Sequence, residues 1–97
     1  MKILVKKTIL YYIKVYPLAK IPLLVWYNTF NALKKIYGNA SIVNNSRVIF
    51  NIKGNDFRLV VSVNFQQNAC YVIWFGTHKE YDKINVETIA FDTKILN

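Results

Sequence analysis

The sequence contains few of the residues on which a disulfide-stapled or metal-bound fold depends. Its 97 residues include one cysteine, Cys70, and one histidine, His78. A single cysteine cannot form an internal disulfide, which is typical of proteins in a reducing compartment, so we expect a cytoplasmic protein. One Cys and one His also fall short of the ligands of a structural zinc site, so we expect no metal and no cofactor.

Glycine, proline and acidic residues are scarce as well. Three Gly, two Pro and five Asp or Glu stand against thirteen Lys or Arg, which gives a net charge of +8. Because 54% of the residues are hydrophobic and 15% aromatic, the composition excludes intrinsic disorder and fits one globular domain over residues 1–97. The positive charge favours a polyanionic partner, which leaves nucleic acid, an anionic membrane or an acidic protein.

No uncharged stretch is suited to crossing a membrane. Residues 21–33 are fewer than the ~20 apolar residues that a span needs, and residues 59–78 are interrupted by polar side chains between Asn64 and Asn68. The basic start, Met1 to Lys7, is not followed by the continuous apolar segment and cleavage site of a secretory signal. We therefore expect neither a membrane association nor a targeting segment.

The first third of the sequence predicts two helices. Apolar residues recur at helical spacing before Pro17, which ends the first helix: Ile9, Tyr12, Ile13 and Tyr16. The second helix is predicted to begin near Pro22 and to end at Gly38-Asn39, after Lys34 and Lys35. Its inward stripe is Leu23, Trp26, Phe30, Leu33 and Tyr37.

From Arg47 onward the apolar residues alternate, which predicts a three-stranded antiparallel meander. Gly54-Asn55 is a two-residue hairpin signal, and Gln67-Asn68 is interpreted as the second turn. With two helices before the strands and a short helix after them, the order of elements predicts an α+β fold. In this fold two N-terminal helices pack on a small antiparallel sheet.

The register of the first hairpin assigns the two faces of the sheet. A turn at Gly54-Asn55 places Asn51 opposite Arg58, and directly opposed residues share a face. The buried face would then hold Phe50, Ile52, Phe57, Leu59, Val61 and Val63, and the other face Asn51, Lys53 and Arg58.

A two-residue second turn would place Thr77 opposite Arg58 and would put an apolar patch of Tyr71, Ile73 and Phe75 on the Arg58 face. A longer second turn would shift this pairing.

The block that follows the third strand carries the only histidine. Thr77 and Glu80 have the spacing of a capping box, which we prefer to a catalytic role for either residue. His78 would then lie in the first turn of a helix, with Tyr81 on the same face. Arg58 and Lys53 would point toward this pair.

Such a group could cleave RNA without a metal ion. The reaction needs a base for the 2′-hydroxyl, cations for the phosphate charge and a proton donor for the leaving 5′-oxygen. By itself the pattern is weak, because a lone histidine beside an arginine is more often structural than catalytic.

Two sequence blocks together resemble the HigB branch of the RelE-like toxins. The first is R-V-I-F-N-I-K-G-N-D-F-R-L at 47–59, and the second is G-T-H-K-E-Y-D-K at 76–83. The resemblance covers about half of the chain strongly, and the rest of the chain agrees with the family in the order of its elements. The stretch 37–46 is shorter than the connection usual in that family, which bears on antitoxin docking or substrate access.

The resemblance implies a RelE-like fold, cleavage of mRNA in the ribosomal A site, and inhibition by a helix-turn-helix antitoxin of the HigA kind. On this sequence it implies three catalytic residues: His78 as general acid or base, Arg58 as transition-state clamp, and Tyr81 to stack on or orient the substrate. The implied RNA-binding residues are Asn51, Lys53 and Asn55, to which we add Lys79 and Lys83 as phosphate contacts.

Two alternatives stay open. A non-catalytic basic module that binds RNA or DNA would explain the charge but would leave the His78 block unused. A regulatory protein that binds only another protein would use the apolar patch of Tyr71, Ile73 and Phe75. Growth arrest on induction, relieved by substitution of His78 or Arg58, would favour catalysis over both.

Overall fold

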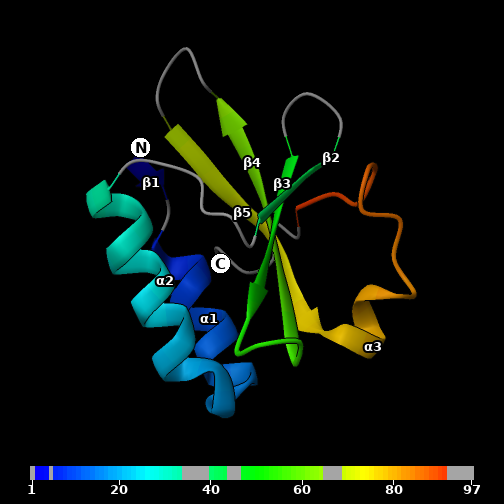
Figure 1. Ribbon diagram of the computed structural model, residues 1–97, viewed down its shortest axis with the longest axis horizontal. Helices are drawn as coiled ribbons and strands as arrows, with labels where there is room; N and C mark the ends of the chain where they lie inside the picture. The colour runs from blue at the N-terminus through cyan, green and yellow to red at the C-terminus, as the bar shows by residue number, and fades with distance from the viewer. Residues whose placement is uncertain (1, 5, 34–39, 44–46, 65–68, 92–97) are drawn as a thin grey trace.

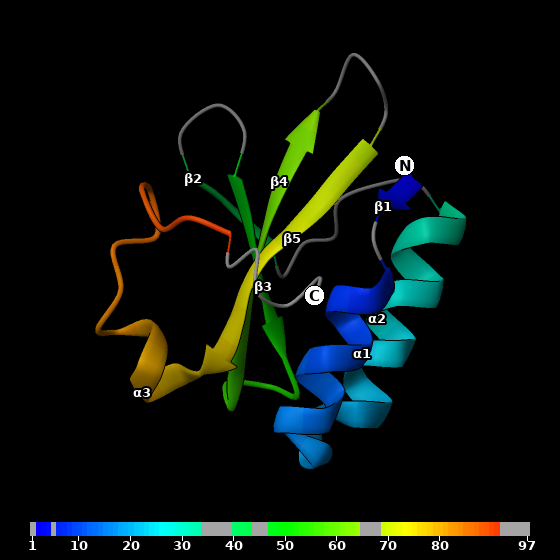
Figure 2. The same ribbon diagram turned by 180° about the vertical axis from the view of Figure 1, so that it is seen from behind.

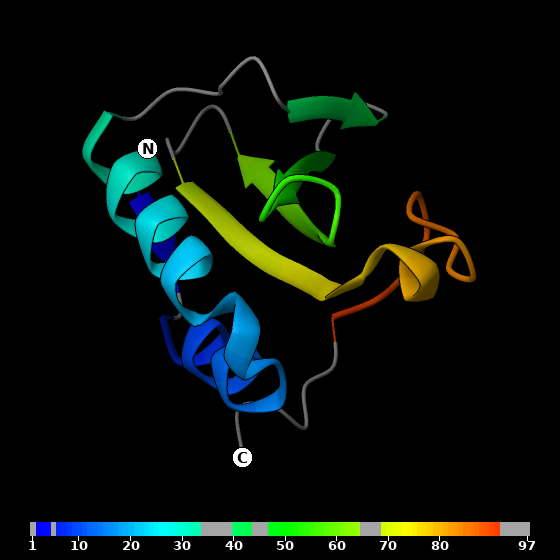
Figure 3. The same cartoon turned by 60° about the horizontal axis from the view of Figure 1, so that its bottom comes forward.

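The computed structural model describes residues 2–4, 6–33, 40–43, 47–64 and 69–91, and its two longer helices lie together on one side of a five-stranded sheet (Figure 1). The elements follow the chain in the order β1 (Lys2–Leu4), α1 (Lys6–Val15), the 3-10 turn η1 (Pro17–Ala19), α2 (Lys20–Leu33), β2 (Ala40–Val43), β3 (Arg47–Ile52), β4 (Phe57–Asn64), β5 (Ala69–Thr77) and α3 (His78–Tyr81). The predicted α+β fold is confirmed. Figure 3 shows α1 and α2 side by side, with α3 at the far end of β5.

The two N-terminal helices agree with their predicted stripes where side chains are described. Helix α1 ends before Pro17 and buries Ile9 and Tyr12. Helix α2 begins at Lys20, earlier than predicted, because η1 leads directly into it; the Lys20 amide donates to the Pro17 carbonyl. Leu23 and Trp26 are buried as predicted.

The other residues of the α2 stripe are not tested. The side chains of Phe30 and Leu33 lie outside the described residues, as do Tyr37, Lys34, Lys35 and the predicted end at Gly38-Asn39.

The sheet has two strands more than the sequence predicted. Its order is β1-β5-β4-β3-β2, with β1 parallel to β5 and the other neighbours antiparallel. Strand β1 has three residues and exists through pairing with a distant partner, Lys2 opposite Ala69, which local periodicity cannot show. Strand β2 lies within the stretch 37–46, for which the sequence predicts only a connection.

The first hairpin has the predicted register, with Asn51 opposite Arg58. Its turn is longer than predicted, because pairing stops at Ile52–Phe57 and the four residues 53–56 form the turn. The Asp56 amide donates to the Lys53 carbonyl at 3.2 Å. Positive φ occurs at Lys53 (54°) and Gly54 (63°).

The second hairpin does not have the predicted register. Arg58 lies opposite Gly76, and Thr77 lies opposite Phe57. Beside the turn the pairing is already displaced by two residues, because Asn64 lies opposite Ala69 and not Tyr71. A β-bulge then reduces the displacement to one residue: Val61 pairs with Val72 and Val60 with Trp74, so Ile73 between them is extra on β5.

Because of the bulge, the prediction of an apolar surface patch on the Arg58 face is wrong. Beyond it, alternation places Phe75 on the helix-covered face, where it is buried, and places Trp74 on the face of Arg58. Tyr71 stays exposed opposite Ser62, and Ile73 is buried in a second cluster. The patch of Tyr71, Ile73 and Phe75 therefore does not exist as a surface.

The main core lies between the helices and one face of the sheet. All six sheet residues predicted for this face belong to it: Phe50, Ile52, Phe57, Leu59, Val61 and Val63. Phe57 and Phe75 stack at 5.2 Å between ring centroids, and the Tyr16 ring packs edge-on against both.

The second face of the sheet is partly covered too. Ile49, Val60 and Ile73 form a small cluster against which Val86, Ile89 and Phe91 pack. The Arg47 guanidinium donates to the Val86 carbonyl at 2.8 Å, which ties the segment 84–91 to β3. In Figure 2 this segment, orange to red, lies on the side of the sheet away from α1 and α2. The open polar face expected around Arg58 is therefore confined to the end of the sheet next to α3.

Gly76→Ala should destabilise the protein. A Cβ at this position would lie 2.6 Å from the Trp74 ring and 3.1 Å from Glu80 Oε1, so we expect the free energy of unfolding to fall by about 1–3 kcal/mol. Urea denaturation measures the change. In a Trp74→Leu background, Gly76→Ala should lower the free energy of unfolding by less, because the ring atoms nearest to the added Cβ are absent.

Gly54→Asn is the control. Nothing lies within 4 Å of a Cβ there, and asparagine tolerates positive φ, so stability should change by less than about 0.5 kcal/mol. Equal losses at Gly76 in both Trp74 backgrounds would contradict the contact argument.

Candidate functional site

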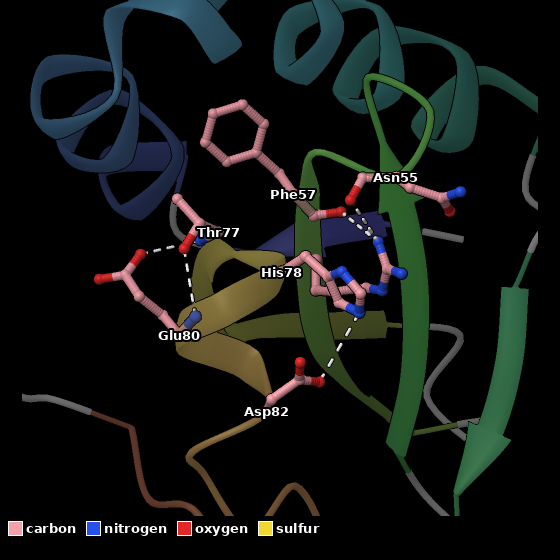
Figure 4. Close-up of polar contacts among 7 residues, drawn as sticks. Asn55, Phe57, Thr77, His78, Glu80 and Asp82 are labelled. Carbon is pink, nitrogen blue, oxygen red and sulfur yellow. Dashed lines mark hydrogen bonds and ion pairs between the residues drawn. The ribbon is translucent and has the colours of Figure 1, made fainter.

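A capping box fixes the turn from β5 into α3. The Thr77 hydroxyl accepts from the Glu80 amide at 3.2 Å, and the Thr77 amide donates to Glu80 Oε1 at 2.8 Å (Figure 4). The predicted capping box is confirmed. Because α3 has only four residues, these two bonds account for much of its local order.

His78 begins α3 and is joined to the β3–β4 turn. Its amide donates to the Asp56 carbonyl at 3.0 Å, which brings the helix against the turn that carries Lys53 and Asn55. Its Nε2 lies 3.6 Å from Asp82 Oδ1, and its side chain is 52% exposed, so it is open to a substrate (Figure 4). Asp82 is not among the predicted site residues, although its spacing of four residues from His78 could have suggested the pair.

A long-range hydrogen bond fixes Glu80. The Tyr16 hydroxyl donates to Glu80 Oε1 at 2.8 Å across 64 residues of sequence. The pKa of Glu80 is lowered, chiefly by the Thr77 amide and also by the Tyr16 bond, while desolvation acts in the opposite direction. Burial, together with the bond to Glu80, raises the pKa of Tyr16 to about 12. No local signal in the sequence could have shown this contact.

Arg58 lies behind the turn and close to Tyr81. Its Nη1 donates to the backbone carbonyls of Asn55 (3.2 Å) and Phe57 (3.1 Å), which fixes the direction of the guanidinium. Burial raises the pKa of Tyr81, and the charge of Arg58 acts against that rise, as expected of a neighbouring cation. The ring of Trp74 lies 6.2 Å from that of Tyr81.

An open hollow of about 440 Å³ lies between η1, the β3–β4 turn and α3. Four predicted site residues line it: Lys53, Asn55, His78 and Lys79. The remaining lining residues are Leu18, Asp56, Phe57 and Thr77. Lys53 is paired with Asp56 at 3.4 Å.

The other predicted residues lie outside the lining of this hollow. Arg58 and Tyr81 adjoin each other, and Asn51 is the cross-strand neighbour of Arg58. Lys83 is exposed just after α3, and its charge contributes to the lowered pKa of Glu80. The geometry thus brings the predicted residues to one end of the sheet, in two adjoining groups, and their roles in catalysis and RNA binding stay predictions.

Within the described residues, no group of three or more His, Cys, Asp and Glu side chains is arranged to hold a metal ion. Over the same residues, no helix is both long enough and apolar enough to cross a membrane.

Comparison with known proteins supports the resemblance seen in the sequence. The family model of HigB toxin, a RelE-like toxic component of a toxin–antitoxin system, matches residues 24–84. The "mRNA interferase toxin HigB" of Escherichia coli K12 and the "mRNA interferase HigB" of Escherichia coli O157:H7 are each 47% identical over 34 residues. Those matches cover 35% of this chain and 33% of each relative.

The lowered pKa of Glu80 should make stability depend on pH in the acid range. The folded carboxyl binds a proton less readily than the unfolded one. Its contribution is therefore complete above the ordinary pKa of about 4.3 and is lost as the pH falls through the folded value. The free energy of unfolding should fall below about pH 5 more steeply in the wild type than in Glu80→Gln.

Urea denaturation at several pH values tests this expectation. Glu87→Gln is the matched control, because it makes the same change at an exposed residue beyond α3, and its pH profile should follow the wild type. A Glu80→Gln profile parallel to the wild type would show that the capping carboxylate does not couple to folding.

Proposed function

Because this chain belongs to the HigB toxin family, the RelE-like toxic component of a toxin–antitoxin system, we propose that it is an endoribonuclease that cleaves mRNA, needs no metal ion and acts on the ribosome. The observation that carries the proposal is the bond from the His78 amide to the Asp56 carbonyl. It joins the two sequence blocks of the family at one end of the sheet. The chain spans about a third of the curated relatives that it matches, so their named mRNA interferase activity supports the proposal without deciding it.

His78 is suited to move the protons of the reaction. As a base it would take the proton of the RNA 2′-hydroxyl, whose oxygen attacks the adjacent phosphorus. The bond from phosphorus to the 5′-oxygen then breaks, and a proton goes to that oxygen, leaving a 2′,3′-cyclic phosphate. Asp82, 3.6 Å from Nε2, would stabilise the protonated imidazole.

Arg58 is suited to stabilise the charge that gathers on the phosphate. Its two bonds to backbone carbonyls hold the guanidinium in place before substrate binds, which is the condition for electrostatic stabilisation of a transition state. In the proposal Tyr81 stacks on or orients the substrate, and Asn51 and Asn55 position the reacting groups.

The approach to the site is basic. Lys53 and Lys79 line the hollow and Lys83 lies at the end of α3, so an RNA backbone would meet cations on entering. No Asp or Glu precedes Asp56 in the chain, so the N-terminal half adds to this positive field. The positive charge alone would equally suit a non-catalytic module that binds nucleic acid. A test of RNA cleavage distinguishes such a module from a ribonuclease.

Family membership implies an antitoxin partner, and we propose one of the helix-turn-helix HigA kind. An inhibitor that competes with RNA for the same cations must present carboxylates to them. Both partners would meet in the cytoplasm, where translating ribosomes supply the mRNA.

Arg58→Ala should abolish most of the cleavage while leaving the fold intact. Losing such a clamp raises a reaction barrier by about 2.7–4 kcal/mol, and losing a proton-transferring side chain in His78→Gln should slow the reaction ~10²- to 10⁴-fold. The measurement is cleavage of mRNA on purified ribosomes, with detection of the 2′,3′-cyclic phosphate end. Free RNA in the presence of a chelator tests the ribosome and metal requirements separately.

Lys14→Ala is the charge-matched control, because Lys14 is exposed on α1 and does not line the hollow. It should retain full activity. A wild type that binds RNA without cutting it would identify a non-catalytic module, and an unchanged rate in Arg58→Ala would remove Arg58 from the mechanism.

Affinity for the antitoxin should fall as salt rises, since ion pairs between exposed groups are screened. Isothermal titration over a salt series measures this, and Lys79→Ala should show a shallower dependence than Lys14→Ala. Affinity that is independent of salt would mean that the antitoxin avoids the cations of the site.

A further inference from the structure

Leu18 is exposed at the edge of the hollow that contains His78. It is 75% exposed, the most of any large apolar side chain whose burial the structure describes. The backbone on both sides of it is fixed: the Ala19 amide donates to the Tyr16 carbonyl at 2.9 Å, and the Ala19 side chain is fully buried. With Ala19 directed inward, η1 holds Leu18 outward at the rim.

The chemistry of the hollow is divided between an apolar wall and a cationic rim. Leu18 and Phe57 form the apolar part, and Phe57 is held rigidly by its stacking on Phe75. Lys53 and Lys79 line the same hollow, and because the Asp56 carboxylate pairs with Lys53 alone, the rim keeps a net positive charge. A ligand that fits both parts has a flat apolar body and a phosphate.

The size of the hollow suits a ligand of this kind. Its volume of about 440 Å³ lies in the range of ~300–1,000 Å³ usual for small-molecule pockets. Asn55 and Thr77, which also line it, carry hydrogen-bonding groups for the edge of a base.

We propose that this hollow is a nucleobase subsite, in which the base next to the scissile phosphate packs against Leu18 and Phe57. The phosphate of that nucleotide lies between Lys53 and Lys79, beside His78. The subsite rests on the proposed function in taking RNA as the ligand. It goes beyond that function because Leu18, which belongs to the N-terminal helical layer, would contribute to the preference for the nucleotide at the cut site.

Binding of non-cleavable 2′-O-methyl RNA tests the subsite directly. Leu18→Ser should weaken binding about tenfold, because the contact of a base with its wall is lost. The matched control is Leu10→Ser: Leu10 is 52% exposed on α1 and does not line the hollow, so its substitution should leave the affinity unchanged.

Oligonucleotides that lack one base at successive positions locate the contact. In the wild type, removal of the base at one position should weaken binding about as much as Leu18→Ser does. In Leu18→Ser, removal of the same base should weaken RNA binding only slightly further, because the contact between the base and Leu18 is already absent. In the NMR spectrum of the wild type, the Leu18 methyl signals should shift on addition of RNA and the Leu10 methyl signals should not.

The possible outcomes separate the subsite from the proposed function. Base-dependent binding that needs Leu18, in a protein that does not cut RNA, supports the subsite and overturns the proposed ribonuclease. Cleavage with the same affinity and the same cut-site preference in the wild type and in Leu18→Ser overturns the subsite. Leu18→Ser that weakens only antitoxin binding also overturns it, since Leu18 would then belong to a protein-docking surface.

Discussion

The hydrogen bond from Tyr16 to Glu80 is the contact on which the placement of the candidate site depends. Helix α3 has four residues, too few to be stable alone, so its position must come from outside it. The Tyr16 ring packs against Phe57 and Phe75 in the main core, which fixes its position. Its hydroxyl donates a hydrogen bond to the Glu80 carboxylate that caps α3 and so restrains that carboxylate. His78 thereby takes its position from the helical layer as well as from the sheet.

The acidic residues around the site are few, and each is engaged. Asp56 pairs with Lys53, Glu80 caps α3, and Asp82 lies beside His78. An unengaged carboxylate here would repel a phosphate, whereas Asp56 is paired with a lysine and Glu80 is occupied by hydrogen-bond donors. The candidate site can therefore contain carboxylates that hold its structure and still present a positive surface.

Sequence reasoning succeeded where the determining interactions are local. The register of Asn51 opposite Arg58 follows from a short turn, and the capping box follows from two residues three positions apart. It failed where distant parts of the chain decide. The bulge at Ile73 places Trp74, and not Phe75, on the Arg58 face. Phe75 packs in the main core and Ile73 in the cluster on the other face, and the alternation of apolar residues along the strand cannot show which of the two clusters a residue joins.

The position of β5 in the sheet has a consequence for the order of folding. Strand β5 lies between β4 and β1, which comes from the start of the chain. The sheet therefore cannot be completed until residues 69–77 have been synthesised. Pairings so far apart in sequence form late, because the entropy of closing a long loop must be overcome first. During synthesis the parts of the candidate site would therefore stay apart, and the ribosome making the chain would not meet an assembled site before most of it had emerged.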